Sequence, residues 1–374
     1  MRRRSFLATP ITAAALPAFS ASPLEAAQGG SQVVAVGDGI PHSPAEYANL
    51  LEKLSSGTET DDYSLGGIVA KLEEKMAAVL GKEFAVWMPT GTLANHLAVR
   101  LLAGEKRRVL VQQESHLYND CGDCCQILSG LNLVPLAQGR ATFTLEDVRR
   151  EAEHGASGRV AAPIGAIQIE TPVRRRTGEA FDFGEMKRIS AWARERGIGL
   201  HLDGARAFLA SAYSGIPVRQ YAALFDTVYI SLYKYFNAGS GAILAGPRRL
   251  LENSFQTRRM FGGGLCHVWP FAAVALHYTD GFEARYAKAV AVSEQVIAGL
   301  EGDSRFAVSR VPHGTNIFYL RVKDTNAGAY RQHALEAGIT LAGSGGENFT
   351  VQVNETWNRA TPAEILARLR RALV

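Results

Sequence analysis

A lysine and an aspartate end two successive apolar runs of the sequence, and both side chains are suited to chemistry. The run GIGLHLD ends at Asp203, and the next run, DTVYISLYK, ends at Lys234. Arg206 follows Asp203 by three residues, and the preceding run, GAIQIE, ends at Glu170. Charged side chains are rare in buried positions unless they are paired or functional. The spacing therefore predicts a polar site built from the ends of buried strands.

Short apolar runs alternate with helical patterns from residue 66 onward, which is typical of an α/β fold. Because the runs lack polar alternation, the sheet is predicted to be mainly parallel and covered on both faces. Gaps of 33 and 31 residues separate Glu170, Asp203 and Lys234, and each suits one strand–helix–strand crossover. The carboxyl ends of such strands meet at one crevice. Strands are predicted at residues 84–88, 107–112, 131–136, 165–170, 197–203, 226–234 and 241–246.

Pyridoxal phosphate is a cofactor that needs a lysine and a buried aspartate together. Its aldehyde forms a Schiff base with a lysine amine, which makes Lys234 the predicted attachment point. A carboxylate beside the ring nitrogen keeps that nitrogen protonated, the role predicted for Asp203. Arg206 could donate a hydrogen bond to the ring hydroxyl oxygen. In the structural alternative, Asp203 caps the next helix and Arg206 is its salt-bridge partner.

The segment Thr90, Gly91, Thr92 lies between a predicted strand and a predicted helix. Backbone N–H groups at a helix N-terminus bind phosphate, so this segment is the predicted phosphate site. His116 follows the strand at residues 107–112 and could stack on the cofactor ring. Taken singly, the threonines could simply cap a helix, and His116 could be a structural histidine. The combination in this order is more specific than any of its members.

The same segments resemble a known family. The motifs PTGTLAN, SHLY, HLDGAR, SLYK, RRMFGGGL and TNIFYLRV are similar to those of the threonine aldolase and aromatic β-eliminating lyase family, over residues 60–320. These are fold-type-I pyridoxal-phosphate enzymes with a large domain and a smaller α+β C-terminal domain. The resemblance implies that Lys234, Asp203 and His116 are catalytic. It also implies a homodimer or homotetramer, in which Arg258 or Arg259 reaches a neighbour's phosphate.

Several departures from the family pattern concern the substrate. The N-terminal stretch VVAVGDGIPHSP lacks the family's Arg-Ser-Asp-Thr-like run. The segment ETPVRRRTGE places Val173 where aldolases have a histidine, and ENFTVQVNE lacks the carboxylate-binding arginine. Tyr233 replaces a serine before the lysine, and Cys266 replaces an arginine after the triple glycine. The residues 174–176, all arginine, could substitute for the missing one or form a solvated loop.

The cofactor half of the predicted site is thus intact and the substrate half is altered. The expected activity is cleavage of a β-hydroxy-α-amino acid to glycine and an aldehyde, with His116 or a water as the base for the hydroxyl proton. β-Elimination, racemisation and a cofactor-binding protein without aldolase activity are the alternatives. A dinucleotide-binding oxidoreductase is disfavoured because no G-x-G-x-x-G opens a first strand-to-helix turn.

The N-terminus resembles a twin-arginine export signal, MRRRSFL, followed by an Ala-rich stretch. The domains are predicted as a signal at 1–27, an arm at 28–60, a large domain at 61–270 and a small domain at 271–374. Export implies a periplasmic location; a disordered basic tail would imply a cytoplasmic one. Removing residues 1–27 lowers the net charge from +4 to +2, which gives no reason to expect a nucleic-acid partner. No stretch is long and apolar enough to predict a stable membrane span.

Three of the four cysteines lie in the segment CGDCC, with the fourth at Cys266. The spacing of Cys121, Cys124 and Cys125 would place them on one helical face, where they could pack as small apolar side chains. A disulfide in an oxidising compartment and a metal site are the alternatives. Because no second ligand pair has suitable spacing, no metal is predicted.

Overall fold

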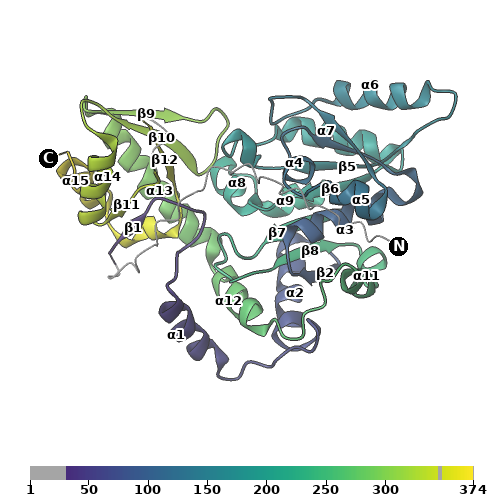
Figure 1. Cartoon of the computed structure of the whole chain (residues 1–374), viewed down its shortest axis with the longest axis horizontal. Coiled ribbons are helices and arrows are strands. Elements are labelled where there is room, and N and C mark those ends of the chain that lie inside the picture. Colours follow the sequence, from purple (N-terminus) through teal and green to yellow (C-terminus); the bar gives the residue numbers. More distant parts are fainter. Residues whose placement is uncertain (1–30, 344–347, 374) are drawn as a thin grey trace, which may run out of the picture.

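The computed structural model describes residues 31–343 and 348–373 (Figure 1). The predicted export signal at residues 1–27 lies outside the described residues, so the signal and the periplasmic location remain predictions. Within the described part of the chain, no helix combines the length and apolar character that crossing a membrane requires.

The large sheet has seven strands, and it confirms the predicted mainly parallel α/β architecture. Strand β8 runs antiparallel to both of its neighbours, whereas every other neighbouring pair is parallel. The strand order is β2-β8-β7-β6-β5-β3-β4. The bounds are β2 Phe84–Met88, β3 Arg108–Gln112, β4 Asn132–Leu136, β5 Ile164–Glu170, β6 Gly199–Asp203, β7 Thr227–Ser231 and β8 Ala242–Gly246.

Helices pack on this sheet through apolar stripes. In α2 (Gly67–Leu80), Ile68, Leu72 and Met76 are buried at the spacing of one helix face, and Val79 on the same face is partly buried. Helix α6 begins with a capping box in which Thr144 and Asp147 bond each other's backbone N–H groups. The helices of this part include α3 Gly91–Ala103, α6 Leu145–Ala156, α7 Phe183–Glu195, α8 Ala207–Ser214, α9 Val218–Ala223, α10 Arg248–Leu251, α11 Ser254–Met260 and α12 Trp269–Thr279.

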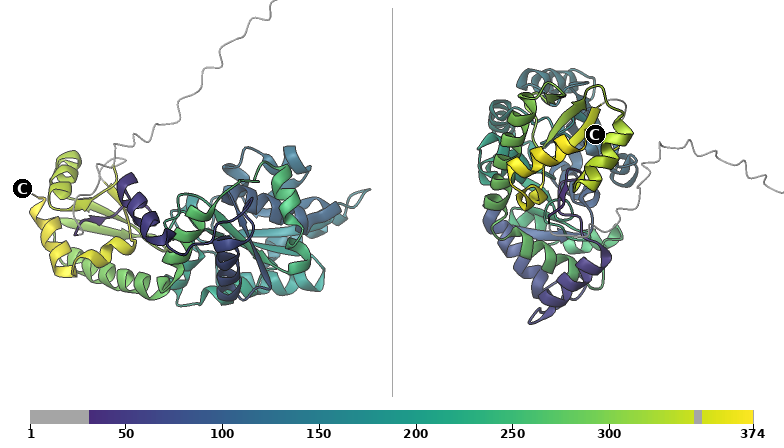
Figure 2. Two further views of the ribbon diagram at one scale, coloured as in Figure 1. Left: turned by 90° about the horizontal axis from the view of Figure 1, so that it is seen from below. Right: turned by 90° about the vertical axis from the view of Figure 1, so that its left-hand side faces the viewer.

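The C-terminal part of the chain forms a smaller unit, seen at the left of the left view in Figure 2. It has a hydrophobic core of its own. Its three-stranded antiparallel sheet, in the order β12-β10-β9, packs with helices and confirms the predicted α+β part. Near the N-terminus, β1 (Val33–Val34) pairs in parallel with β11 (Ile339–Thr340) beside this core. The other elements are α1 Pro44–Ser55, α13 Phe282–Glu301, β9 Phe306–Arg310, β10 Ile317–Val322, α14 Ala327–Glu336, β12 Asn348–Gln352 and α15 Pro362–Arg371.

Helix α13 belongs to both cores. Phe282 and Tyr286 pack in the core of the large sheet, whereas Ala289 and Val296 pack in the C-terminal core. The helix therefore joins the two parts of the molecule, and the predicted boundary after residue 270 remains a prediction.

The cysteine segment differs from the expected single helical face. It divides into α4 (His116–Asn119) and α5 (Cys124–Ser129), because Gly122 and Asp123 adopt positive φ angles of 57° and 53°. All four cysteines are free thiols, so the alternative of a disulfide is wrong for this structure. Cys125 is buried in an apolar cluster, which is the predicted packing role. The described residues contain no group of three side chains placed to hold a metal ion.

Candidate active site

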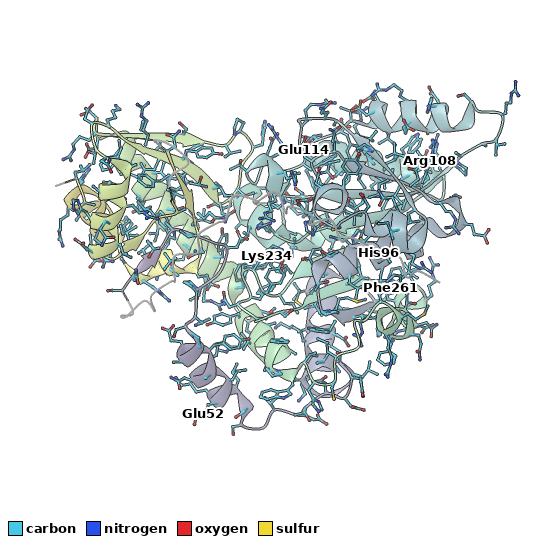
Figure 3. The ribbon with its side chains drawn as sticks, in the orientation of Figure 1. Glu52, His96, Arg108, Glu114, Lys234 and Phe261 are labelled. Carbon is cyan, nitrogen blue, oxygen red and sulfur yellow. The ribbon has the colours of Figure 1, made fainter. Side chains whose placement is uncertain are left out.

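A cavity of about 380 Å³ lies at the carboxyl ends of β5 and β6 and the N-terminus of α3. Lys234 lies near the middle of the molecule, close to the junction of its two parts (Figure 3). The structure thus brings all seven residues of the predicted site to one cavity. Its lining comprises Pro89, Thr90, Gly91, Thr92, His116, Glu170, Arg174, Asp203, Ala205, Arg206, Tyr229, Tyr233, Lys234, Gly239 and Ser240.

The predicted phosphate segment forms the first turn of α3. The Thr90 hydroxyl caps this helix by accepting a 3.2 Å hydrogen bond from the Leu93 N–H. The N–H groups of Gly91 and Thr92 precede the first intrahelical donor, Ala94, and find no acceptor among the described residues. Only glycine fits at position 91, where a Cβ would lie 2.0 Å from the Tyr229 hydroxyl oxygen. The segment therefore presents unpaired donors and a positive helix end to the cavity.

Asp203 is buried at the end of β6, and two donors fix its carboxylate. The Asn95 side-chain amide donates to Oδ2 at 2.6 Å, and the Ala205 N–H donates to Oδ1 at 3.1 Å. Behind it, the Asn95 carbonyl oxygen lies 2.8 Å from His201 Nε2, and His201 Nδ1 lies 2.9 Å from the Thr227 hydroxyl. Since Asn95 donates to the carboxylate, its oxygen faces His201, which then carries its proton on Nε2. This buried chain orients Asp203 toward the cavity.

The buried His201 gives a pH-dependent contribution to stability. Burial lowers the pKa of His201 from 6.5 to about 3. Between these values the unfolded chain binds a proton that the folded chain excludes, so stability falls as the pH falls below 6.5. We expect this site to remove up to about 1.4 kcal/mol of unfolding free energy per pH unit. Urea unfolding at pH 7 and pH 5 should show a smaller loss in His201→Gln; an equal loss in both proteins would contradict the account.

Lys234 lies three residues beyond β7, rather than at the strand end as predicted. The strand stops at Ser231, and the chain turns before it re-enters the sheet as β8. The Lys234 amine donates a 3.1 Å hydrogen bond to the Tyr233 hydroxyl and lies 5.9 Å from the centre of the Tyr229 ring. Burial, together with the positive charge of Arg206, lowers the pKa of the Lys234 amine. A lowered pKa favours the neutral amine, which is the nucleophilic form.

Arg206 pairs with Asp38, not with Asp203. The Arg206 Nε atom lies 2.7 Å from Asp38 Oδ2, and Asp38 Oδ1 accepts from the Asn316 amide at 3.1 Å. The alternative that Arg206 is the salt-bridge partner of Asp203 is therefore wrong. Asp38 belongs to the N-terminal segment that departs from the family pattern, and sequence reasoning missed it. One carboxylate thus joins the cavity to the N-terminal segment and to the start of β10.

We expect Asp38→Asn to destabilise the protein by about 3 kcal/mol, because it leaves the Arg206 guanidinium buried without its counter-charge. The two side chains are only 17% and 6% exposed. Urea unfolding measures the effect. Glu294→Gln is the control, since it breaks an exposed pair with Arg310 and should cost less than about 1 kcal/mol. Similar small losses in the two variants would contradict a structural role for Asp38.

Glu170 is a buried residue of the cavity lining, and its carboxylate holds two backbone groups of the neighbouring loops. Its carboxylate accepts the His116 N–H at 2.6 Å and the Arg174 N–H at 3.0 Å. Burial, assisted by the nearby Asp203 charge, raises the pKa of Glu170 to about 8. The strand-end position identified Glu170 in the sequence, but its role as an anchor for His116 depends on the folded loops. Asn95 and Tyr229 were missed entirely.

The His116 ring lies between two polar side chains. Its Nε2 atom is 3.4 Å from the Thr92 hydroxyl oxygen, and its Nδ1 atom is 3.3 Å from Asp120 Oδ2. Asp120 also accepts a 2.6 Å bond from Arg175. The ring is thus held beside the phosphate segment, where it could stack on the face of a flat cofactor.

These groups fit pyridoxal phosphate by the chemistry of the donor set. The cavity presents a nucleophilic amine, a buried carboxylate, a flat imidazole and unpaired N–H donors at a helix N-terminus. These match the aldehyde, the ring nitrogen, the ring face and the phosphate of that cofactor. Gly91 also has a steric role. Because it lacks a Cβ, the backbone at the start of α3 can lie close to Tyr229 beside the predicted phosphate site.

Arg258 does not reach toward a neighbouring subunit. It is fully buried and donates to the Trp87 carbonyl at 2.5 Å and to the Tyr63 carbonyl at 3.2 Å. The expectation that it contacts a neighbour's phosphate is therefore wrong. Arg259 stacks on the Tyr63 ring at 4.9 Å, and its role, like the homodimer or homotetramer, remains a prediction.

Comparisons with known proteins match this geometry. A family model described as beta-eliminating lyase matches residues 49–323. The low specificity L-threonine aldolase of Saccharomyces cerevisiae is 32% identical over 208 residues, which cover 55% of this chain and 53% of that protein. A probable low-specificity L-threonine aldolase 2 of Arabidopsis thaliana is 28% identical over 278 residues, 72% of this chain and 77% of that protein. The chain spans about half the length of the fungal relatives it matches.

Solved structures share the fold. A putative L-allo-threonine aldolase from Listeria monocytogenes is 27% identical with a TM-score of 0.76, and the match covers 92% of this chain and 96% of that one. Threonine aldolase from Leishmania major, at 18% identity and a TM-score of 0.69, covers 91% of this chain and 98% of its own and shows the fold alone. The predicted fold-type-I architecture is confirmed.

Proposed function

The chain belongs to the beta-eliminating lyase family, and from that premise we propose that it is a pyridoxal-phosphate-dependent lyase of the threonine aldolase type. The proposed reaction cleaves the Cα–Cβ bond of a β-hydroxy-α-amino acid and yields glycine and an aldehyde. The observation that carries the proposal is the convergence of Lys234, Asp203, Arg206, His116 and the phosphate segment on one cavity. Relatives bearing the name threonine aldolase support the reaction type.

Each residue has a role that follows from its position. Pyridoxal phosphate, when bound, supplies an aldehyde that joins a primary amine and a ring that withdraws electrons from the substrate's Cα. Lys234 supplies the amine that tethers the cofactor, and its lowered pKa favours the neutral form. Asp203, whose carboxylate is fixed by bonds from Asn95 and Ala205, would keep the ring nitrogen protonated. The N–H groups of Gly91 and Thr92 would bind the phosphate.

The proton of the β-hydroxyl group needs an acceptor in the cavity. Val173, at the position of the family's histidine, is fully buried and apolar, so it cannot accept the proton. His116 lines the cavity, and its Nε2 atom lies 3.4 Å from the Thr92 hydroxyl oxygen, beside the predicted phosphate segment. We assign it the proton transfer, either directly or through one water. Glu170 positions it by accepting its backbone N–H.

Racemisation is the second candidate function. The alanine racemase TOXG of Cochliobolus carbonum is 27% identical over 197 residues, 52% of this chain and 50% of that protein. Racemisation and aldol cleavage use the same cofactor and differ in which bond at Cα stands perpendicular to the ring. Val173 favours this alternative, since it removes a polar group from the family's substrate half.

A substrate panel separates these possibilities. The purified protein, loaded with pyridoxal phosphate, is incubated with threonine, allo-threonine, phenylserine and L-alanine, and both aldehyde release and alanine enantiomers are measured. Aldehyde from one or more β-hydroxy amino acids supports the lyase. D-Alanine without aldehyde would replace it with the racemase. Neither product, with cofactor retained, would identify a binding protein that lacks both activities.

A further inference from the structure

The segment after β5 carries three consecutive arginines, and the structure gives them different surroundings. They form a short 3₁₀ turn, Arg174–Arg176, which begins four residues after the cavity residue Glu170. Two backbone bonds close the loop: Val173 N–H to the Glu179 carbonyl at 2.9 Å, and Gly178 N–H to the Val173 carbonyl at 3.0 Å. The turn is therefore a hydrogen-bonded part of the cavity rim, although Arg174 and Arg175 are exposed to solvent, as the alternative of a solvated loop predicts.

Two of these arginines are engaged by carboxylates outside the cavity lining. Arg175 Nη2 lies 2.6 Å from Asp120 Oδ1, and Arg176 Nε lies 3.2 Å from Glu179 Oε2. Arg174 differs from both. It lines the cavity, its backbone N–H is fixed by Glu170, and its side chain has no hydrogen-bond or ion-pair partner among residues 31–343 and 348–373. Its guanidinium is therefore free to bind a ligand.

The other cations of the cavity already have partners or roles. Arg206 is neutralised by Asp38. Lys234 is bonded to Tyr233 and, in the proposed function, holds the cofactor. Arg174 is thus the remaining positive side chain of the described cavity lining that can receive an anionic group of a substrate.

The position where the family carries its carboxylate-binding arginine offers no substitute. Strand β12 and the residues after it contain Gln352, whose side-chain oxygen accepts the Gly37 N–H at 2.6 Å and which does not line the cavity. A substrate with an α-carboxylate would therefore lack an anchor on that side. Arg174, in the segment after β5, offers an anchor for the carboxylate at the rim of the cavity.

We propose that Arg174 binds the α-carboxylate of the amino acid substrate and so replaces the arginine missing near the C-terminus. The inference rests on the proposed use of the cavity for an amino acid, and it deepens that function by naming a specificity-determining residue. A guanidinium can grip a carboxylate through two parallel N–H···O bonds. Such a grip fixes rotation about the bond between nitrogen and Cα, which decides the bond that is broken.

The test measures binding separately from turnover. Binding of glycine, L-alanine and glycinamide is followed through the visible spectrum of the cofactor-loaded protein in wild type, Arg174→Gln, Arg174→Lys and Arg176→Gln. Glycinamide has the amine but no carboxylate. We expect Arg174→Gln to weaken binding of glycine and alanine at least about tenfold, the loss typical of a charge-assisted hydrogen bond, and to leave glycinamide within about twofold of wild type. Arg174→Lys should recover part of the loss, and the matched control Arg176→Gln should bind like wild type.

Three results would overturn the assignment. The first is an equal loss for glycine and glycinamide, which would indicate a structural effect of Arg174. The second is unchanged amino acid binding in Arg174→Gln, and the third is no binding of either amino acid by the loaded wild type. Failure of the lyase proposal is distinguishable from all three, because it would appear as Arg174-dependent binding without release of an aldehyde in the substrate panel.

Discussion

Replacing Lys234 with alanine is expected to lower the lyase activity by at least about 10³-fold, the scale of losing a covalent catalytic group. The variant should also lose the visible absorbance of the tethered cofactor. The reason is chemical, since Lys234 supplies the amine in the cavity that can join the aldehyde. Within the part of the chain that the structure describes, the side chain makes one hydrogen bond, to Tyr233, so the fold should survive the change.

Lys82 provides the matched control. It too is a partly buried lysine, with a pKa lowered to about 8 by burial, and it donates to the Phe225 carbonyl away from the cavity. The Lys82→Ala variant should keep the cofactor absorbance and the specific activity of the folded protein. Equal loss of absorbance in both variants, or an intact band in Lys234→Ala, would show that the cofactor is held elsewhere.

Changing Asp203 to asparagine is expected to lower kcat by about 10²-fold or more, as removal of a preorganised charge at a reacting centre does. Asparagine has nearly the same shape but no negative charge, so the ring nitrogen would lose the partner that keeps it protonated. The cofactor should still bind through Lys234 and the phosphate segment. Steady-state kinetics and the absorbance spectrum give the two readouts.

The loss of kcat in Asp203→Asn should come from the lost charge. A substitution farther along the hydrogen-bond chain from Asp203 tests this. Thr227→Val removes the far end of the chain that runs from Asp203 through Asn95 and His201, without touching the carboxylate. We expect a much smaller loss of kcat for Thr227→Val than for Asp203→Asn. A kcat for Asp203→Asn within about threefold of wild type would contradict the role assigned to Asp203.

The parallel sheet and the position of its polar edge follow directly from the sequence. Residues ending apolar runs about one crossover apart must meet at the carboxyl edge, and Asp203 and Glu170 lie opposite each other in the pairing of β5 with β6. Lys234 was placed correctly in space although the strand ends three residues earlier, because the following turn stays at the same edge. The pattern of apolar runs was sufficient to predict this edge because strands that follow one another in the sequence form it.

Contacts between distant segments were not predictable in the same way. Asp38 meets Arg206 across 168 positions of the chain, and a lone aspartate in an irregular segment gives no periodic signal. Asn95 lies on a helix face whose sequence pattern indicates only packing against the core. Its hydrogen bond to Asp203 forms only when α3 packs on β6. The arginine run is visible in the sequence, but only the folded loop distinguishes Arg174 from its two paired neighbours.

The helical interpretation of the cysteine segment failed for a local reason. Gly122 and Asp123 both take positive φ angles. These two residues separate α4 from α5, so the segment is not one continuous helix. Glycine does so readily, and aspartate tolerates the left-handed region better than most residues. The spacing of three cysteines resembled a helix face, although the residues between them favoured a turn.

If the cavity holds pyridoxal phosphate on Lys234, the link can be located directly. Borohydride reduction of the cofactor-loaded protein makes such a link permanent, and proteolysis with peptide mass spectrometry locates it. We expect the phosphopyridoxyl group on the peptide that contains Lys234 and on no other lysine to a comparable extent. A group found on Lys82 or another lysine, or no modified peptide from protein that shows the visible band, would contradict it.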